Sequence, residues 1–233
     1  MTPNAFRCYP MSGLILLMGG NEFRPECEAM DRSVLARIGT NPRVVILPTA
    51  AAYENPGLAA ENGLRHFIRL GARAEAAMVV NSATARDEKW LALIRNADII
   101  YLAGGDPVYL LETLRNSAAW EAVLEVRKTG RTLAGSSAGA MVLGGQTWAP
   151  GKGWHKGLGL LPGFAILPHH ARLAELWNAE GMRSSLPEGV TLIGIDEATA
   201  LLGPPWEVNG TGKVAVYKSD SPDFFTQGQS VAL

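Results

Sequence analysis

The chain has 233 residues, of which 47% are hydrophobic and 18% are charged. This composition favours one globular domain with a large core, predicted over residues 1–233 with a loose leader at 1–12. The formal net charge of -1 gives no general attraction to nucleic acid or to an anionic membrane, so a small neutral or zwitterionic ligand is the expected partner.

Cysteine usage and hydropathy point to a reducing, aqueous compartment. Cys8 and Cys27 lie far apart without a C-x-x-C spacing, so neither a disulfide framework nor a thiolate zinc site is indicated. The apolar run at 14–18 is too short to span a bilayer and ends in Gly19-Gly20 instead of a signal cleavage pattern. The expected location is therefore the cytoplasm.

Short apolar strands alternate with helices through most of the chain. Strands are predicted at 13–18, 43–47, 77–80, 98–102, 132–134, 164–167 and 190–195. Helices are predicted at 25–38, 58–70, 87–95, 108–116, 118–128 and 171–182. Strands that are apolar on both faces and separated by helices favour a mostly parallel sheet covered on both sides, which is a three-layer α/β sandwich.

The part of the chain after residue 140 is less regular. Residues 151–163 contain so many glycines that an irregular loop is predicted there, forming one wall of a site. Short strands at 200–202, 206–208 and 213–217 predict a small antiparallel extension, a closing meander with a turn at Asn209-Gly210.

The segment Gly135-Ser136-Ser137-Ala138-Gly139 fits the G-x-S-x-G pattern of a nucleophile elbow. In such an elbow a serine occupies a sharp turn between a strand and a helix, with its hydroxyl exposed. The helix that follows directs unpaired N–H groups toward that hydroxyl, where an oxyanion needs stabilisation. A second interpretation is tight packing of a strand on a helix, which also selects small residues.

A serine nucleophile needs a base, and the base needs an orienting acid. His169 and His170 directly follow one predicted strand, and Asp196 and Glu197 follow the next. Because parallel strands end at one edge of a sheet, these groups are expected to converge on Ser137. The chain order of serine, histidine and acid differs from the order in α/β-hydrolases.

Simpler interpretations exist for each of these residues. His169 suits a surface or capping position, and the acids suit a turn. The stretch at 104–107 (GGDP) is also typical of an ordinary turn. A metal site formed by His169, His170 and Asp196 is conceivable, but the adjacent histidines lack the i, i+4 spacing of a helical ligand pair. The joint placement of the residues favours a hydrolase.

Four short motifs together resemble the serine peptidase family of cyanophycinase and dipeptidase E (aspartyl dipeptidase). They are Gly104-Gly105-Asp106, the elbow from Gly135 to Ala140, Pro168-His169, and the segment at 194–200. The likeness extends over residues 13–217. It implies a fold similar to class I glutamine amidotransferase domains, which is flavodoxin-like, and a Ser-His-Glu triad.

Carried onto the matching positions, the resemblance implies Ser137 as nucleophile, His169 as general base and then acid, and Glu197 as the orienting carboxylate. It also implies that Gly105 and Ala138 donate the N–H groups of the oxyanion hole. Such a triad needs no metal and no organic cofactor. The family resemblance further implies a homodimer or a larger homo-oligomer.

The chain departs from the family where substrate is bound. Cyanophycinases typically have glutamine at the position of Pro107, and an arginine-rich run after the histidine that this chain lacks. Asp106, His170 and Arg172 are the candidate substrate-binding residues. Arg172 is the candidate for holding a substrate carboxylate, because a guanidinium can bind a carboxylate through two hydrogen bonds.

The predicted function is hydrolysis of short peptides by a serine peptidase. The expected substrates are dipeptides or small peptides with an N-terminal aspartate, or β-linked aspartyl peptides. Two alternatives are an esterase that uses the same triad, and a catalytically silent small-molecule-binding or regulatory domain of the same fold.

Overall fold

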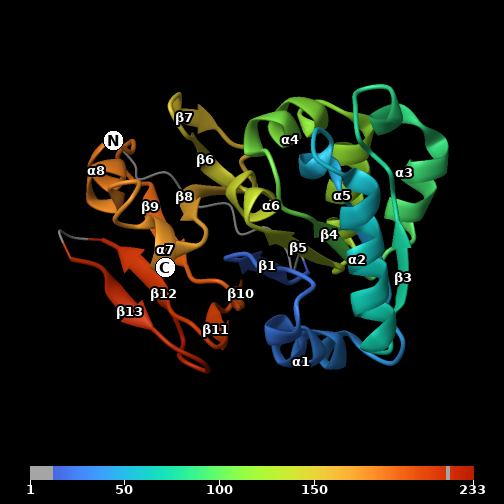
Figure 1. The fold of residues 1–233 in the computed structure, drawn as a ribbon, viewed down its shortest axis with the longest axis horizontal. Helices are drawn as coiled ribbons and strands as arrows, with labels where there is room; N and C mark the ends of the chain where they lie inside the picture. Colours follow the sequence, from blue (N-terminus) through green and yellow to red (C-terminus); the bar gives the residue numbers. More distant parts are fainter. Residues whose placement is uncertain (1–12, 219–220) are drawn as a thin grey trace, which may run out of the picture.

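The computed structural model describes residues 13–218 and 221–233, and the predicted leader at 1–12 lies outside the described residues. A seven-stranded sheet with helices on both faces forms one half of the molecule, and a six-stranded sheet forms the other half (Figure 1). The larger sheet has the strand order β11-β10-β1-β5-β4-β2-β3. Its strands are β1 (Ile15–Met18), β2 (Arg43–Leu47), β3 (Arg73–Ala76), β4 (Ile99–Leu102), β5 (Thr132–Ser136), β10 (Thr199–Gly203) and β11 (Glu207–Gly210).

The five strands from β1 to β5 are parallel to one another, and β10 and β11 extend the sheet as antiparallel strands beyond β1. Successive residues of the parallel strands face opposite layers. Leu17 packs with α3, α4 and α5 on one face, and Leu16 packs with α1 and α2 on the other. The predicted three-layer α/β class is therefore confirmed.

Local signals explain where the covering helices begin and end. Asn55, Asp87 and Ser117 cap the N-termini of three of them by accepting backbone N–H groups, and Gly39 with a φ of 139° ends α1. The helices are α1 (Glu28–Ile38), α2 (Pro56–Arg69), α3 (Glu88–Arg95), α4 (Pro107–Leu114), α5 (Ala118–Lys128), α6 (Ala138–Met141), α7 (His170–Leu173) and α8 (Ala179–Ser184), with 3-10 turns at Pro25–Cys27, Thr49–Ala51 and Thr84–Arg86.

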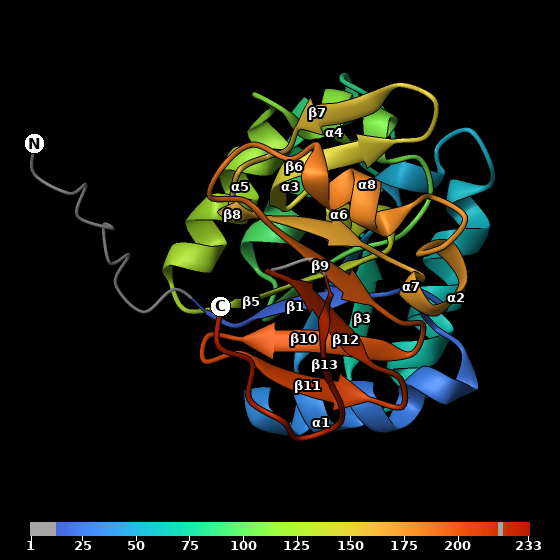
Figure 2. The same ribbon diagram turned by 90° about the vertical axis from the view of Figure 1, so that its left-hand side faces the viewer.

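The smaller sheet has the strand order β13-β12-β9-β8-β6-β7 and lies across the front of Figure 2. Residues of α8, Ala179 and Met182, pack on its buried face. Its strands are β6 (Gly144–Ala149), β7 (Gly153–Lys156), β8 (Leu161–Leu167), β9 (Thr191–Ile195), β12 (Val214–Tyr217) and β13 (Asp223–Phe225). Because β8 and β9 are parallel, this sheet also brings two strand ends to one edge.

The irregular loop predicted at 151–163 is confirmed at 157–160 and is wrong at 153–156 and 161–163, which are strands. β6 and β7 form an antiparallel hairpin there, and β8 begins at Leu161. Glycine serves close backbone approach at this place, since a Cβ atom on Gly157 would overlap the carbonyl oxygen of Gly144. A glycine-rich sequence can therefore be a tightly packed sheet segment.

Two further predictions of elements are corrected. The strand predicted at 77–80 lies at 73–76 instead, because the carbonyl oxygens of Val79 and Val80 accept hydrogen bonds from the side chains of Thr49 and Tyr109, at 2.6 Å each, and the chain has left the sheet. The helix predicted at 171–182 is two short helices, separated at Asn178, whose φ is 52°.

The closing meander is also different from the prediction. β10 and β11 pair in the larger sheet, whereas β12 pairs with β9 in the smaller one. Asn209 and Gly210 belong to β11 and do not form the predicted turn. The C-terminal strands therefore extend both sheets, and β10 contacts both β9 and β12.

Leu17 provides a test of how much the larger sheet depends on its central strand. The side chain is completely buried in β1, between β5 and β10. Leu17→Ala should lower the free energy of unfolding by about 2–5 kcal/mol, because it removes buried methyl groups and leaves a cavity. Urea unfolding measures the change, and Leu176→Ala, at a side chain that is 74% exposed, is the control. Equal stability of the two variants would contradict this packing.

Candidate active site

Ser137 occupies the turn between β5 and α6. Its φ of 49° and ψ of -114° lie outside the usual regions for a residue with a side chain, as expected for a nucleophile elbow. Its N–H donates to the carbonyl of Met18 at 3.0 Å. A Cβ atom on Gly135 would overlap the carbonyl of Gly139, so the elbow closes only with glycine there.

His169 lies two residues after the end of β8 and has its Nε2 atom 3.1 Å from the Ser137 hydroxyl oxygen. Its backbone is left-handed, with a φ of 50°, and its N–H donates to the carbonyl of Gly19 at 2.8 Å. A Cβ atom on Gly20 would overlap the imidazole ring. The glycine pair after β1 thus makes room for the ring beside the serine.

Glu197 completes a hydrogen-bonded chain that starts at Ser137. Its Oε1 atom lies 3.0 Å from Nδ1 of His169, and it follows β9 by two residues. With Nδ1–H donating to the carboxylate, Nε2 is left to accept the serine proton. The structure selects Glu197 over Asp196 as the partner of this histidine, as the family resemblance implies.

Two backbone N–H groups lie next to the serine without an acceptor among residues 13–218 and 221–233. They belong to Gly105 and Ala138. Gly105 has a φ of 138°, and a Cβ atom on Gly104 would lie 3.2 Å from Cβ of Ser137, so the loop after β4 borders the nucleophile. These are the two N–H groups that the family resemblance implies for an oxyanion hole, and that role stays a prediction.

Glu22 belongs to the site and was not among the residues predicted from the sequence. Its Oε1 atom accepts the N–H of Gly104 at 2.7 Å, and its Oε2 atom accepts the hydroxyl of Ser136 at 2.8 Å. The one available signal was a carboxylate two residues after the glycine pair that ends β1.

The three predicted substrate-binding residues have different surroundings. Asp106 caps α4 by accepting the N–H groups of Val108 and Tyr109, and it also lines a cavity of about 380 Å³ together with Tyr53 and Lys152. Arg172 is 67% exposed, and its Nε atom lies 3.5 Å from Glu197. Both residues remain candidates for substrate contacts.

His170 contacts other residues than Ser137, and its predicted substrate contact stays a prediction. Its buried ring lies 2.8 Å from the hydroxyl of Tyr217 through Nε2 and 3.4 Å from Asp196 through Nδ1. No cluster of three His, Cys, Asp or Glu side chains suited to a metal ion occurs in the described part of the chain. The contacts of His170 with Tyr217 and Asp196 link α7 to strand β12 and to the residue after β9 in the smaller sheet.

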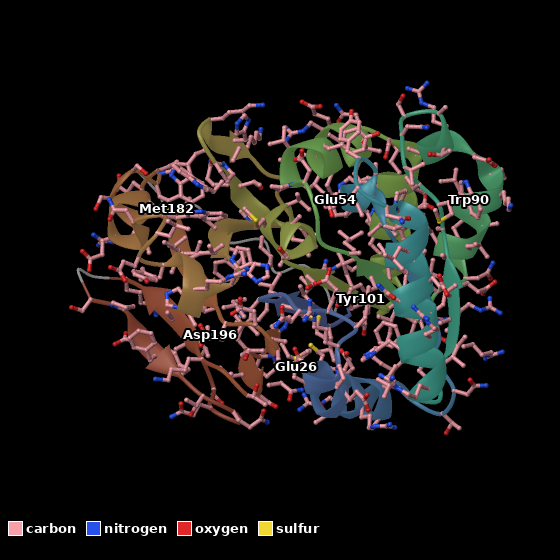
Figure 3. The ribbon with its side chains drawn as sticks, in the orientation of Figure 1. Glu26, Glu54, Trp90, Tyr101, Met182 and Asp196 are labelled. Atoms are coloured by element: carbon pink, nitrogen blue, oxygen red, sulfur yellow. The ribbon has the colours of Figure 1, made fainter. Side chains whose placement is uncertain are left out.

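The surroundings of Asp196 change its acidity. Burial alone would raise the pKa of Asp196, but the nearby His170 imidazole and a hydrogen bond from the backbone N–H of Lys213, at 2.9 Å, hold the pKa below its ordinary value. The carboxylate of Asp196 therefore stabilises the folded state in its charged form. In Figure 3 Asp196 lies on the side of the smaller sheet, and Tyr101 lies between the larger sheet and α2.

Comparison with known proteins agrees with this geometry. The sequence profile of peptidase family S51 matches residues 14–204. The chain belongs to peptidase family S51. The resemblance seen in the sequence motifs is thus confirmed, and the match includes the elbow, the histidine and the acid.

Two solved structures of peptidases are similar to this chain in fold. The crystal structure of a peptidase from an acI-B1 Actinobacterium has a TM-score of 0.86 and 30% identity, and the match covers 96% of this chain and 98% of that one. A protein described as a peptidase E from Listeria monocytogenes has a TM-score of 0.65 and 19% identity, with coverage of 86% and 100%. The second similarity concerns the fold alone.

Two curated relatives are the uncharacterized peptidases Lin0382 of Listeria innocua and Lmo0363 of Listeria monocytogenes. Each is 30% identical over 99 residues, which are 42% of this chain and 46% or 47% of the relative. The chain spans about half the length of the curated relatives it matches. Within the described residues, no helix combines the length and apolar character needed to cross a bilayer.

The lowered pKa of Asp196 predicts a pH-dependent contribution to stability. A depressed folded-state pKa stabilises above the unfolded value of about 3.9, and the contribution is lost as the pH falls through the folded value. Asp196→Asn should therefore lower the free energy of unfolding at pH 7, with a difference that shrinks below about pH 4. Urea unfolding at several pH values measures it, with the exposed Glu54→Gln as control. A difference that is constant with pH would contradict the assignment.

Proposed function

We propose that this member of family S51 hydrolyses a peptide bond of short peptides with Ser137 as nucleophile. The observation that carries the proposal is the hydrogen-bonded chain from Ser137 through His169 to Glu197, with contacts of 3.1 and 3.0 Å. A binding domain has no need of a serine activated in this way, so the geometry favours catalysis over a silent regulatory domain.

The reaction follows from the positions of the protons. The Ser137 oxygen attacks the peptide carbonyl carbon while Nε2 of His169 takes the hydroxyl proton, and Glu197 stabilises the imidazolium that results. The negative oxygen of the tetrahedral intermediate faces the N–H groups of Gly105 and Ala138. His169 then donates its proton to the leaving amine, which departs and leaves an acyl-enzyme. Water, activated by the same histidine, releases the acid product.

The proposed substrates are dipeptides and small peptides with an N-terminal aspartate, or β-aspartyl peptides. Support comes from Arg172, which lies three residues after His169, about one helical turn, and has an exposed side chain next to Glu197. A guanidinium there suits a substrate carboxylate. The cavity next to Asp106, of about 380 Å³, provides room for a second residue of the peptide. The homo-oligomer and the cytoplasmic location stay predictions.

Replacing residues of the hydrogen-bonded chain tests the proposed peptidase. Ser137→Ala should lower kcat/KM on a cleaved dipeptide by roughly 10⁴-fold or more, and Glu197→Gln should lower it less, because the orienting acid contributes less than the nucleophile. Ser184→Ala, at an exposed serine of α8, is the control.

The substrates of this assay are α-Asp-X, β-Asp-X and non-acidic dipeptides, with matched esters. Cleavage of esters alone would support the esterase. Undiminished turnover by Ser137→Ala would rule out the mechanism.

The role of Arg172 is tested on the same panel. Arg172→Ala should raise KM for aspartyl dipeptides by about tenfold or more, since a charge-assisted pair with the substrate is lost, and Arg172→Lys should recover part of the binding. A non-acidic dipeptide that is cleaved slowly serves as the internal control. If Arg172→Ala acted only by disturbing Glu197, the cleavage of both kinds of dipeptide would fall. An equal loss on both would contradict the carboxylate-binding role.

A further inference from the structure

Glu22 joins the two loops from which the oxyanion N–H groups come. Its carboxylate accepts the N–H of Gly104 at 2.7 Å and the hydroxyl of Ser136 at 2.8 Å. Gly104 directly precedes one proposed oxyanion donor, Gly105, and Ser136 lies two residues before the other, Ala138. One side chain from the loop after β1 therefore connects the segment after β4 to the last residue of β5.

We infer that Glu22 is a positioning residue that sets the oxyanion hole, an inference that rests on the proposed serine-peptidase function. The loop after β4 contains two adjacent glycines, whose backbone is free to rotate. The hydrogen bond from the Gly104 N–H to Glu22 fixes the peptide unit between Ala103 and Gly104, which directly precedes the unit that carries the Gly105 N–H. The N–H of Gly105 is then left for the substrate oxygen at no cost of reorganisation during the reaction.

Glycine at position 104 is part of the same arrangement. A Cβ atom there would lie 2.7 Å from Oε1 of Glu22, which is closer than a carbon and an oxygen that are not bonded can approach without displacement. The carboxylate thus occupies the space that a side chain on residue 104 would need. The requirement for glycine and the position of the carboxylate explain each other.

The loop that carries Glu22 is held in an unfavourable conformation. Asn21 and Phe23, on either side of it, have φ values of 61° and 66°, and a positive φ is rare for a bulky residue such as phenylalanine. The Phe23 ring lies 5.0 Å from Tyr101 and 6.0 Å from Phe67, and these contacts hold the loop in place. Strain that the surroundings maintain in this way is typical of segments that position a functional group.

Glu22 has a neighbour that serves as a matched control. Glu26 is an exposed carboxylate four residues later, and its nearest hydrogen bond is a long one, 3.4 Å, from the amide of Asn21. If a negative charge near the site is all that matters for activity, Glu22→Ala and Glu26→Ala should both lower it. If the contacts with Gly104 and Ser136 matter, Glu22→Ala alone should lower it.

Kinetics of Glu22→Ala, Glu22→Gln and Glu26→Ala on a cleaved dipeptide test the inference. Glu22→Ala should lower kcat by about 10²-fold, the loss found when an oxyanion donor is removed, with KM little changed. It should weaken binding of a peptide boronate, which mimics the tetrahedral intermediate, by a similar factor. Glu22→Gln should recover most of the activity, because its amide oxygen accepts the Gly104 N–H and its NH₂ group can donate to the Ser136 oxygen. Glu26→Ala should match the wild type.

Ser136→Ala keeps the test valid if Glu22→Ala is poorly folded by circular dichroism. It removes one of the two contacts of Glu22 and should lower kcat by about tenfold with KM little changed. Undiminished kcat in a folded Glu22→Ala or in Ser136→Ala, or a loss confined to KM, would overturn the inference.

A separate reaction distinguishes this outcome from failure of the proposed function. A fluorophosphonate should label Ser137 of the wild-type protein and should leave Ser137→Ala unlabelled. Absence of labelling in an otherwise folded wild type would overturn both the peptidase mechanism and the inference on Glu22. Labelling together with normal kcat in Glu22→Ala would overturn the inference alone.

Discussion

Three consecutive backbone carbonyls at the end of β1 accept hydrogen bonds from the three segments that carry the proposed triad. Met18 accepts the N–H of Ser137 at 3.0 Å, Gly19 accepts that of His169 at 2.8 Å, and Gly20 accepts that of Ala198, next to Glu197, at 3.2 Å. The serine segment belongs to the larger sheet and the other two to the smaller one. The end of β1 therefore holds the two sheets in the register that aligns the side chains.

The same hydrogen bonds hold the backbone in conformations that residues with side chains rarely adopt. Ser137, His169 and Ala198 have φ values of 49°, 50° and 50°. Conformations with a positive φ cost of order 1–3 kcal/mol each for residues with side chains, and they persist only where surrounding contacts maintain them. The N–H of each strained residue donates to a carbonyl of Met18, Gly19 or Gly20, so the end of the buried strand β1 and the two glycines after it supply the contacts that keep the turns in place. A rigid core strand thus supports geometry that the turns would not keep by themselves.

The sequence carried enough information to predict the main layers and the central side chains. Apolar strands separated by helices predicted the larger sheet. The polar residues that follow the strands left His169 or His170 and Asp196 or Glu197 open as partners of Ser137, and the family resemblance favoured His169 and Glu197. The second sheet was missed because Gly157 and the other glycines of 151–163 were interpreted as loop residues, although Gly157 permits its backbone to touch that of Gly144. Local patterns do not distinguish a glycine needed for a turn from one needed for close approach.

Glu22 and His170 show the same limit for single side chains. Glu22 contacts residues more than eighty positions away, and no periodicity reports such a contact. His170 is next to His169 in sequence, yet a left-handed residue at 169 turns the chain, so the two rings leave in different directions and only one reaches the serine. Adjacent residues of one type can therefore have unrelated roles, and the backbone conformation between them decides which is which.

The turn at His169 also connects the proposed chemistry to substrate choice. Because α7 starts directly after His169, Arg172 lies about one helical turn after the histidine. Its Nε atom is therefore near the same carboxylate, 3.5 Å from Oε1 of Glu197. The residue that places the proposed base beside Ser137 is thus followed directly by the short helix that carries Arg172. Under the proposed function, a substitution on α7 would change which substrate carboxylate is held without moving the carbonyls of Met18, Gly19 and Gly20 that hold the three triad segments. In that proposal the strand ends set the reaction, and the helix after the histidine sets the substrate.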